Sequence, residues 1–553
     1  MPDRKGPGRL SWLIDVATRL ADRGAAVAGW RRCLAAVVMG AVAATALPPW
    51  HVVPLLVPAF VGLVWLMDGS RSARTGFFVG WCFGLGHSLV GIHWIVSPLL
   101  VEPERHAWLI PFALGGLSAG LAVFPAIAVA LTVAAMRAGL ASGAARVPAL
   151  AGFWLAAEWV RGWALTGFPW NLIGYVWADM PAMFQLSALA GIHGLSLMTV
   201  LAAAAPALLA DRPEGGSSTM RGAVWIVVAL TLALPAAVWA GGAFRLSEAP
   251  PPGGHAFADV RLRLVQANIP QRLKWLPELR EAHLLKHVSL SRRRSNGQAP
   301  PTHVIWPEAA VPFFLASDPT ATKVAVEAIP PDGLLITGSP RAEDMGGQRM
   351  FWNSVHAVDG TSSIVATYDK SHLVPFGEYV PFRGILPIDR IVPGQGDFTP
   401  GAGRATLRLD GLPPLSPLIC YEAIFPAAAV DRRDRPDWIL SLTNDAWFGS
   451  NAGPKQHFAI ARMRSVEEGL ALVRVANTGI SAIVDPYGRV LERLGIGEEG
   501  IIDGALPVPL DEPTPFSRLG QWTVAVLFAL SSAGVWLLRL MYRFRPGTSR
   551  EIA

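Results

Sequence analysis

The sequence predicts a polytopic bundle of membrane-spanning α-helices joined to a layered α/β domain outside the bilayer. Charged residues make up 16% of the 553 residues, against roughly 25% in an average soluble protein, and the mean hydropathy is +0.37. Long apolar stretches fill the chain up to residue 245, whereas strand-like runs alternate with polar, Pro/Gly-rich loops over 245–515. This composition excludes a wholly soluble or disordered chain.

Eight apolar stretches approach the length of roughly 20 residues that a bilayer-spanning helix needs. We expect these spans at 33–50, 52–67, 75–99, 107–136, 147–165, 185–210, 222–241 and 519–540. The predicted organisation is then an N-terminal segment over 1–32, a membrane domain with seven spans over 33–244, an inserted domain over 245–515, an eighth helix over 516–541 and a tail over 542–553.

Basic residues orient the predicted spans, because cytoplasmic loops of membrane proteins carry an excess of Lys and Arg. They gather in the N-terminal segment, in alternate loops and in the tail: Arg71 and Arg74, Arg137 and Arg146, Arg212 and Arg221, then Arg543, Arg545 and Arg550. The intervening loops hold only Arg105 at 100–106 and no Lys or Arg at 166–184. The termini are therefore expected in the cytoplasm and the inserted domain outside it. This arrangement also explains the net charge of +6 without a nucleic-acid partner.

Three strand-like runs of the inserted domain each end in a reactive side chain. THVIWPE ends at Glu308, SSIVATYDK at Lys370 and LSPLIC at Cys420. Loops at strand ends are where layered α/β enzymes present reactive groups. A free cysteine has a pKa near 8.5, so a nearby ammonium that favours the thiolate and a carboxylate that takes the proton would activate it. Alone, each residue would be ordinary, but together they predict a nucleophilic site.

The other cysteines and histidines show no pattern of a disulfide or metal site. Cys33 and Cys82 lie in apolar stretches, far from Cys420. His87 and His93 are six residues apart on an apolar helix, which is not a metal-ligand spacing, so we expect interior hydrogen bonds.

Glu158 and Arg161 lie three residues apart in the fifth predicted span. Charges in a membrane are costly and usually paired, so we expect a structural pair. A contact with a lipid headgroup is the alternative.

The three reactive residues carry a family resemblance. Glu308 in IWPE, Lys370 in YDKSHLVPFGEYVP and Cys420 in ICYE resemble the Glu-Lys-Cys triad of the nitrilase, or carbon–nitrogen hydrolase, superfamily. The flanking segments VQANIPQRLKW (265–275), SLTNDAWFG (441–449) and RVANTGISAIVDPYGRV (474–490) fit the same superfamily. The resemblance implies a nitrilase-like αββα sandwich for the inserted domain.

A nitrilase-like domain held between seven spans and one more is similar to the family of apolipoprotein N-acyltransferases. The segment EWVRGWALTGFPWNLIGY (158–175) resembles the membrane part of that family. The resemblance implies transfer of a phospholipid sn-1 acyl chain, with phosphatidylethanolamine as the expected donor, to the N-terminal diacylglyceryl-cysteine of an apolipoprotein. It further implies a multi-pass protein of the bacterial inner membrane with a periplasmic catalytic domain, and no metal or other cofactor.

The resemblance also implies roles for individual residues. Cys420 would form a thioester, Glu308 would serve as general base and Lys370 would stabilise the oxyanion.

The supporting residues have two interpretations each. Glu378 and Glu422 would lie near the triad, although each could equally brace a loop. Trp447 and Phe448 would line the acyl pocket, although core aromatics would look the same, and Tyr421 has the same two interpretations. The apolar stretch 375–399 is expected to contact the membrane or the acyl chains.

Two other functions fit parts of the sequence. A membrane-anchored nitrilase-type amidase that hydrolyses a soluble substrate would share the triad, but it needs only one anchor. A transporter or receptor would place polar groups and broken helices at the midplane, whereas the predicted spans hold few ionisable residues.

Overall fold

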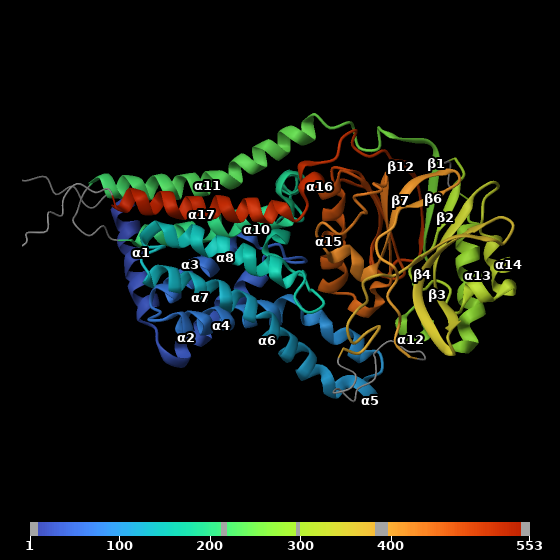
Figure 1. The fold of residues 1–553 in the computed structure, drawn as a ribbon, viewed down its shortest axis with the longest axis horizontal. Helices are drawn as coiled ribbons and strands as arrows, with labels where there is room; N and C mark the ends of the chain where they lie inside the picture. Colours follow the sequence, from blue (N-terminus) through green and yellow to red (C-terminus); the bar gives the residue numbers. More distant parts are fainter. Residues whose placement is uncertain (1–8, 212–217, 295–298, 382–395, 544–553) are drawn as a thin grey trace, which may run out of the picture. The chain divides into compact units, whose positions relative to one another are not determined.

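The computed structural model describes residues 9–211, 218–294, 299–381 and 396–543, and these form two compact units. One unit takes the described residues within Met1–His93, Pro111–Phe244 and Gln521–Ala553. The other takes those within Trp94–Ile110 and Arg245–Gly520. Figure 1 shows helices in the first and two sheets flanked by helices in the second.

The first unit is a helical bundle. Its longer helices are α1 (Arg9–Ala26), α2 (Gly29–Ala44), α3 (Leu56–Asp68), α4 (Ala73–Gly91), α7 (Val123–Arg137), α8 (Arg146–Arg161), α10 (Leu186–Ala204), α11 (Ser218–Ser247) and α17 (Trp522–Arg543). Short helices α6 (Leu117–Leu121) and α9 (Pro181–Phe184) lie between them. Glycines let α2 and α4 approach closely: a Cβ on Gly40 would lie 1.9 Å from the Phe83 carbonyl oxygen, and one on Gly86 would lie 2.0 Å from that of Val37.

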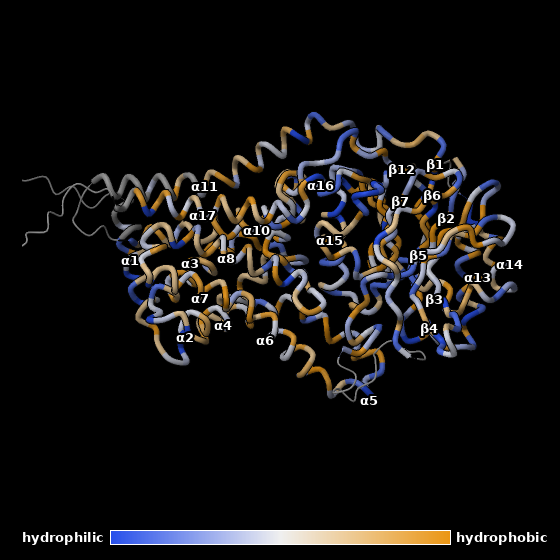
Figure 2. Tube along the Cα trace, in the orientation of Figure 1, coloured by the Kyte–Doolittle hydropathy of each residue, from blue (hydrophilic) through white to orange (hydrophobic). Residues whose placement is uncertain are grey.

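Within the described residues, three helical segments are long and apolar enough to cross a membrane: Pro103–Arg137, Leu186–Ala210 and Trp522–Leu540. A fourth is obtained if the bent pair Ala73–Gly91 and His93–Leu100 is one span. Figure 2 colours much of α10 and α17 as hydrophobic. Large apolar side chains on α17, among them Leu530, Trp536 and Leu537, remain exposed, as expected for a helix whose solvent is lipid.

The eight predicted spans are only partly reproduced. A helix lies at each predicted place, but α3 has 13 residues and α2 and α8 have 16 each, so the count of eight is not confirmed. The predicted span 75–99 is broken, because α4 ends at Gly91 and the next segment is bent by 48°. Pro98, which lacks an amide hydrogen, lies inside the 3₁₀ segment that follows. The N-terminal segment contains α1, a helix that the hydropathy pattern did not predict.

The second unit contains two six-stranded mixed sheets. The first has the order β12-β1-β2-β3-β4-β5, and the second has the order β11-β10-β9-β8-β7-β6. Parallel pairing joins β1 to β2 and β2 to β3 in the first sheet, and β7 to β8 and β8 to β9 in the second. The strands are β1 (Ala256–Gln266), β2 (His303–Ile305), β3 (Leu334–Met345), β4 (Gln348–Asp359), β5 (Ile364–Asp369), β6 (Leu407–Leu409), β7 (Leu412–Ile419), β8 (Trp438–Thr443), β9 (Ala471–Ala476), β10 (Ser481–Val484), β11 (Val490–Leu494) and β12 (Gly500–Pro507).

Hydrophobic residues divide this unit into four layers. One core joins the two sheets, with Leu264 and Leu440 among its members. The next residue of β1, Val265, turns to the opposite face, where α13 (Arg280–Ser291) and α14 (Pro319–Val326) cover the first sheet. Helix α15 (Ala452–Glu468) covers the second sheet (Figure 1). The arrangement is the αββα sandwich that the family resemblance implied.

A glycine in β3 lets the chain after β2 pass close to the sheet. A Cβ on Gly338 would lie 2.7 Å from the Glu308 Cα and 2.6 Å from the Ala309 amide nitrogen. Both contacts are with backbone, which cannot move aside as a flexible side chain can. The lack of a side chain at Gly338 therefore lets the segment that carries Glu308 lie this close to β3.

We predict that Gly338→Ala destabilises the α/β unit by about 1–3 kcal/mol, as overpacking does in other cores. The measurement is the midpoint of thermal unfolding of the detergent-solubilised protein. Gly360→Ala is the matched control, because a Cβ there would have no atom within 4 Å. Equal midpoints for the two variants would contradict this explanation.

Candidate active site

Three strand ends bring together the reactive residues that the sequence singled out. Glu308 follows β2, Lys370 follows β5 and Cys420 follows β7. The first two strands belong to one sheet and β7 to the other. All three side chains are buried, with exposed fractions of 7%, 1% and 5%.

The Lys370 ammonium is held between two carboxylates. Its Nζ lies 2.9 Å from the carboxylate of Glu378 and 3.8 Å from Oε1 of Glu308. Asn353 Nδ2 donates to both carboxylates, at 2.8 Å to Glu308 Oε1 and 2.9 Å to Glu378 Oε1. The Asn444 amide donates to the other Glu308 oxygen at 2.8 Å. Both Glu308 oxygens are thus fixed by hydrogen bonds.

Burial and neighbouring charges set the protonation of this cluster. Burial raises the pKa of Glu308, the Lys370 ammonium lowers it and the Glu378 carboxylate raises it, with a net rise. For Lys370, burial opposes the charge, but the carboxylates of Glu378 and Glu308 outweigh it and raise the pKa of the ammonium. Lys370 therefore stays charged, and Glu308 is a stronger base than an exposed glutamate.

Cys420 lies beside both charges. Burial and the Glu308 carboxylate raise the pKa of the Cys420 thiol, while Lys370 opposes them. The resting side chain is therefore a thiol whose proton must be removed when it reacts. Its backbone has φ of +50°, a left-handed conformation that is uncommon outside glycine.

A buried network behind Cys420 holds this backbone. His457 Nε2 donates to the Cys420 carbonyl oxygen at 3.1 Å, and His457 Nδ1 lies 2.8 Å from Asp445 Oδ1. Arg474 Nη2 donates to Asp445 Oδ2 at 2.8 Å. Burial opposes ionisation of Asp445, but Arg474 and His457 outweigh it and hold the pKa of Asp445 below its usual range.

Glu422 connects the Lys370 strand to the Cys420 strand. Its Oε1 accepts hydrogen bonds from the Tyr368 hydroxyl at 2.9 Å and from the Ser371 amide at 2.8 Å. Its Oε2 accepts from the Ile419 amide at 2.8 Å. Of the two interpretations of Glu422, this geometry is that of a brace between strand ends.

The remaining predicted residues lie around this centre. Tyr421 packs edge-on against Phe425, with ring centroids 5.2 Å apart. Phe448 packs edge-on against Trp94 at 4.8 Å and against His457 at 5.3 Å, and Trp447 lines a pocket described below. The stretch 375–399 is described only at its ends; residues 382–395, which carry much of its apolar character, lie outside the described residues.

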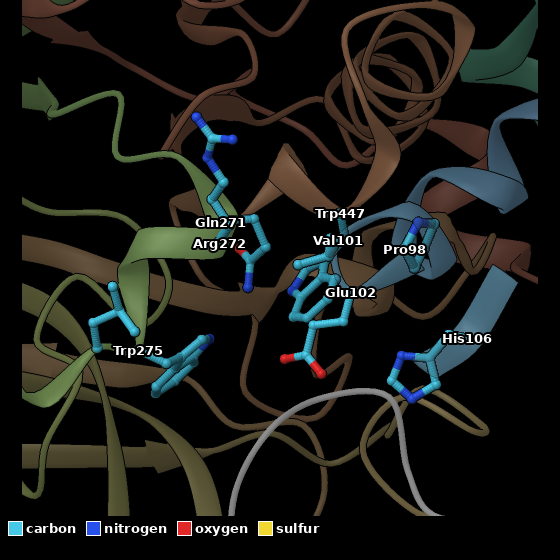
Figure 3. A pocket seen from close by; sticks show the side chains of 9 residues that line it. Pro98, Val101, Glu102, His106, Gln271, Arg272, Trp275 and Trp447 are labelled. Carbon is cyan, nitrogen blue, oxygen red and sulfur yellow. The ribbon is translucent and has the colours of Figure 1, made fainter. Parts of the chain in front are cut away.

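A cavity of about 370 Å³ opens within the α/β unit (Figure 3). Its walls come from three segments: Pro98, Val101, Glu102 and His106; Gln271, Arg272, Trp275 and Leu276; and Trp447. Gln271 links the cavity to the reactive cluster, since its Oε1 accepts from Asn444 Nδ2 at 2.7 Å.

In the part of the chain that the structure describes, no three His, Cys, Asp or Glu side chains gather to hold a metal ion.

Several residues of the site were not singled out from the sequence. Asn444, Asp445 and Arg474 lie inside the flanking segments that carried the resemblance, so their polar character was a usable signal.

Lys274 lies in such a flanking segment too. Its Nζ donates to the Glu308 carbonyl oxygen at 3.4 Å. Burial lowers the pKa of Lys274 to about 8, although the Glu308 carboxylate opposes this shift. Asn353, like His457, is one polar residue in an ordinary stretch and gives no local signal.

In the helical unit, the polar residues of α8 bind backbone. Glu158 Oε1 accepts from the Ile173 amide at 2.8 Å, and Arg161 donates to the Trp170 carbonyl at 3.1 Å. Both therefore anchor the loop that follows α8. The expected hydrogen bond is present at His93, whose Nδ1 lies 2.8 Å from the Val90 carbonyl oxygen, but the buried Nδ1 of His87 has no partner among the described residues.

Comparisons with known proteins cover both units. Residues 39–205 match the family model described as the apolipoprotein N-acyltransferase N-terminal domain, and residues 261–515 match the one described as carbon-nitrogen hydrolase. The solved structure of Nit3 from Saccharomyces cerevisiae, a member of the nitrilase superfamily, aligns with 55% of this chain and 100% of its own at 15% identity, with a TM-score of 0.34.

Curated relatives match over nearly the full length. An apolipoprotein N-acyltransferase of Rhodopseudomonas palustris is 40% identical over 535 residues, 94% of this chain and 97% of its own. That of Bradyrhizobium diazoefficiens is 41% identical over 518 residues, 91% of this chain and 94% of its own. With the two family models matching the helical and the α/β regions, the chain belongs to the apolipoprotein N-acyltransferase family.

Proposed function

We propose that this membrane protein transfers an acyl chain from a phospholipid to the N-terminal diacylglyceryl-cysteine of an apolipoprotein. The observation that carries the proposal is the meeting of a buried thiol, a paired ammonium and a doubly hydrogen-bonded carboxylate at Cys420, Lys370 and Glu308. The near full-length similarity to curated apolipoprotein N-acyltransferases supports it.

In the first half-reaction, Cys420 Sγ attacks the carbonyl carbon of the phospholipid sn-1 ester. Its proton passes to the Glu308 carboxylate, which burial has made more basic. The Lys370 ammonium stabilises the negative charge that develops on the carbonyl oxygen. The carbon–oxygen bond then breaks, the glycerol oxygen takes the proton from Glu308, and a lysophospholipid leaves a thioester on Cys420.

In the second half-reaction, the α-amine of the diacylglyceryl-cysteine attacks the thioester. Glu308 takes the amine proton and returns it to Sγ as the carbon–sulfur bond breaks, so an amide forms and the thiol is restored. A thioester suits this step, because an amine attacks it more readily than it attacks an oxygen ester. Protons and electron pairs balance without a metal or another cofactor.

A membrane-anchored amidase with a soluble substrate is the alternative. It would use the same three residues, but it would have no need of the helical region that matches the family's N-terminal domain over 39–205.

The finer membrane arrangement is also part of the proposal. We place eight spans in the bacterial inner membrane, seven over 33–244 and one over 516–541, with the catalytic domain of 245–515 in the periplasm. The segment 1–32 and the tail 542–553 are then cytoplasmic, in keeping with the Arg asymmetry. Phosphatidylethanolamine is the expected acyl donor.

The supporting residues take distinct roles in this proposal. Glu378 holds the Lys370 ammonium at 2.9 Å, and Glu422 fixes the distance between the two strand ends. Trp447, Phe448 and Tyr421 provide apolar surface beside the reacting thioester.

We predict that Cys420→Ala and Cys420→Ser abolish turnover, because alanine has no nucleophile and a serine ester is a poor acyl donor. Lys370→Met and Glu308→Gln should each lower the rate by about 10²–10³. The measurement is intact mass after mixing with phospholipid, where wild-type protein gains one acyl group. Cys33→Ala and Cys82→Ala are controls that should acylate normally.

A diacylated lipopeptide with a free α-amine should discharge this acyl-enzyme, and its N-acetylated form should not. Release of free fatty acid at the same rate with and without the peptide would favour the amidase-like hydrolase instead.

We predict an acid limb in the acylation rate at a pH above the ordinary glutamate value of about 4.3. Glu308 accepts a proton only as the carboxylate, and its pKa is raised, so activity falls as the pH drops through that raised value. Glu378→Gln removes a carboxylate that raises the pKa of Glu308, so the limb should move to lower pH. Glu327→Gln, at an exposed ion pair with Arg292, should leave the limb in place. A limb unmoved by Glu378→Gln would contradict this electrostatic account.

We predict that reporter fusions at position 215 and after position 545 report the cytoplasm, whereas a fusion at 296 reports the periplasm. The Arg-rich loops at alternate ends of the predicted spans are the reason. Alkaline phosphatase and green fluorescent protein fusions measure the two sides. A cytoplasmic signal from the 296 fusion would overturn the orientation.

A further inference from the structure

The cavity of about 370 Å³ presents two hydrogen-bond donors that have no partner among the residues that the structure describes. They are Gln271 Nε2 and Trp275 Nε1, and both atoms are buried. The Gln271 side chain is only 8% exposed. A buried N–H group without an acceptor costs about 1–3 kcal/mol, so these donors indicate a site that an acceptor fills.

The orientation of the Gln271 amide is determined by a chain of hydrogen bonds that starts at backbone. Asn477 Nδ2 donates to the Ile269 carbonyl at 2.8 Å, while Asn477 Oδ1 accepts from the Ile269 amide at 3.1 Å. Since a carbonyl only accepts and an amide only donates, Asn477 cannot be flipped.

The orientation of Asn477 in turn fixes the orientations of Asn444 and Gln271 through two further hydrogen bonds. Asn477 Nδ2 donates to Asn444 Oδ1 at 3.0 Å, and Asn444 Nδ2 donates to Gln271 Oε1 at 2.7 Å. Gln271 must therefore turn its NH₂ group, and not its oxygen, away from Asn444. Figure 3 shows this amide lying between Trp275 and Trp447.

The other walls of the cavity limit the chemistry of the ligand. Pro98, Val101 and Leu276 supply apolar surface, and the donors themselves are uncharged. Arg272 and Glu102 carry opposite charges, and the Arg272 side chain extends away from Glu102 in Figure 3. An uncharged acceptor on an apolar molecule fits these walls better than an anion does.

We propose that this cavity binds a non-reacting ester carbonyl of a glycerolipid, with Gln271 Nε2 and Trp275 Nε1 as donors. The inference rests on the proposed function, which supplies two molecules with that chemistry: the phospholipid donor and the diacylglyceryl peptide acceptor. The link through Asn444, whose amide binds Glu308 at 2.8 Å, sets the bound ester beside the reacting groups. Gln271 is then a specificity-determining residue.

The test compares full-length variants on lipids with and without the carbonyl. In the acylation arm, the donors are phosphatidylethanolamine with an sn-2 ester and its analogue with an sn-2 alkyl ether. In the discharge arm, the acceptors are a diacylglyceryl and a dialkylglyceryl lipopeptide. Intact mass of the protein measures the formation and discharge of the acyl-enzyme. We expect wild-type protein to prefer the ester by about 5- to 10-fold in at least one arm, the value of one hydrogen bond.

Gln271→Glu keeps the oxygen that accepts from Asn444 and replaces the donor by an acceptor, whereas Gln271→Met removes both. Each should abolish the preference for the ester. Gln348→Glu, at an exposed position of β4, is the matched control and should keep it. Loss in the acylation arm assigns the site to the phospholipid, loss in the discharge arm assigns it to the lipopeptide, and loss in both means that the two lipids use it in turn.

The two proposals fail in different measurements. Wild-type protein that never gains an acyl group on Cys420 would contradict the proposed function. Wild-type protein that acylates but shows no ester preference in either arm, or Gln271 variants that keep that preference, would overturn the cavity assignment alone. Equal rates of Cys420 alkylation by iodoacetamide in all variants check that the fold is intact.

Discussion

The candidate active site depends on the burial of one ammonium group between two carboxylates. Lys370 would lose its charge in an apolar interior without partners, and Glu308 alone would be protonated there. Together, at 2.9 and 3.8 Å, they keep the ammonium charged while leaving Glu308 a strong base. Asn353 adds a hydrogen bond to each carboxylate, which limits how far either can turn. Removing Lys370 would leave the two buried carboxylates without a cation.

Two features of the backbone allow Glu308 and Cys420 to take their places in this cluster. Gly338 lets the segment that carries Glu308 pass close to β3, and Cys420 takes a left-handed conformation directly after β7. Such a conformation persists where its surroundings hold it. Here the surroundings are the His457 hydrogen bond to the Cys420 carbonyl and the buried Asp445–Arg474 ion pair. The positions of the reactive atoms are therefore determined by the core as much as by the loops.

The meeting of Glu308, Lys370 and Cys420 was predictable because each follows a strand-like run, and the end of such a run is visible in the local sequence. The layered α/β class followed from the same runs, whereas the αββα sandwich was implied by the family resemblance. The number of membrane-crossing helices was harder to predict, since hydropathy does not show where packing ends α2, α3 or α8 or where Pro98 interrupts a helix. Asn353 and His457 could not be found either. Their partners lie 45 and 37 positions away in the chain, and no periodicity records a contact of that kind.

The Glu422 brace has a mechanical consequence. It accepts from residues that follow β5 in one sheet and from the last residue of β7 in the other. Sliding of one sheet over the other would break these bonds and would also separate Cys420 from Glu308. The brace therefore opposes sliding of the two sheets past each other at the strand ends where Cys420 and Glu308 meet.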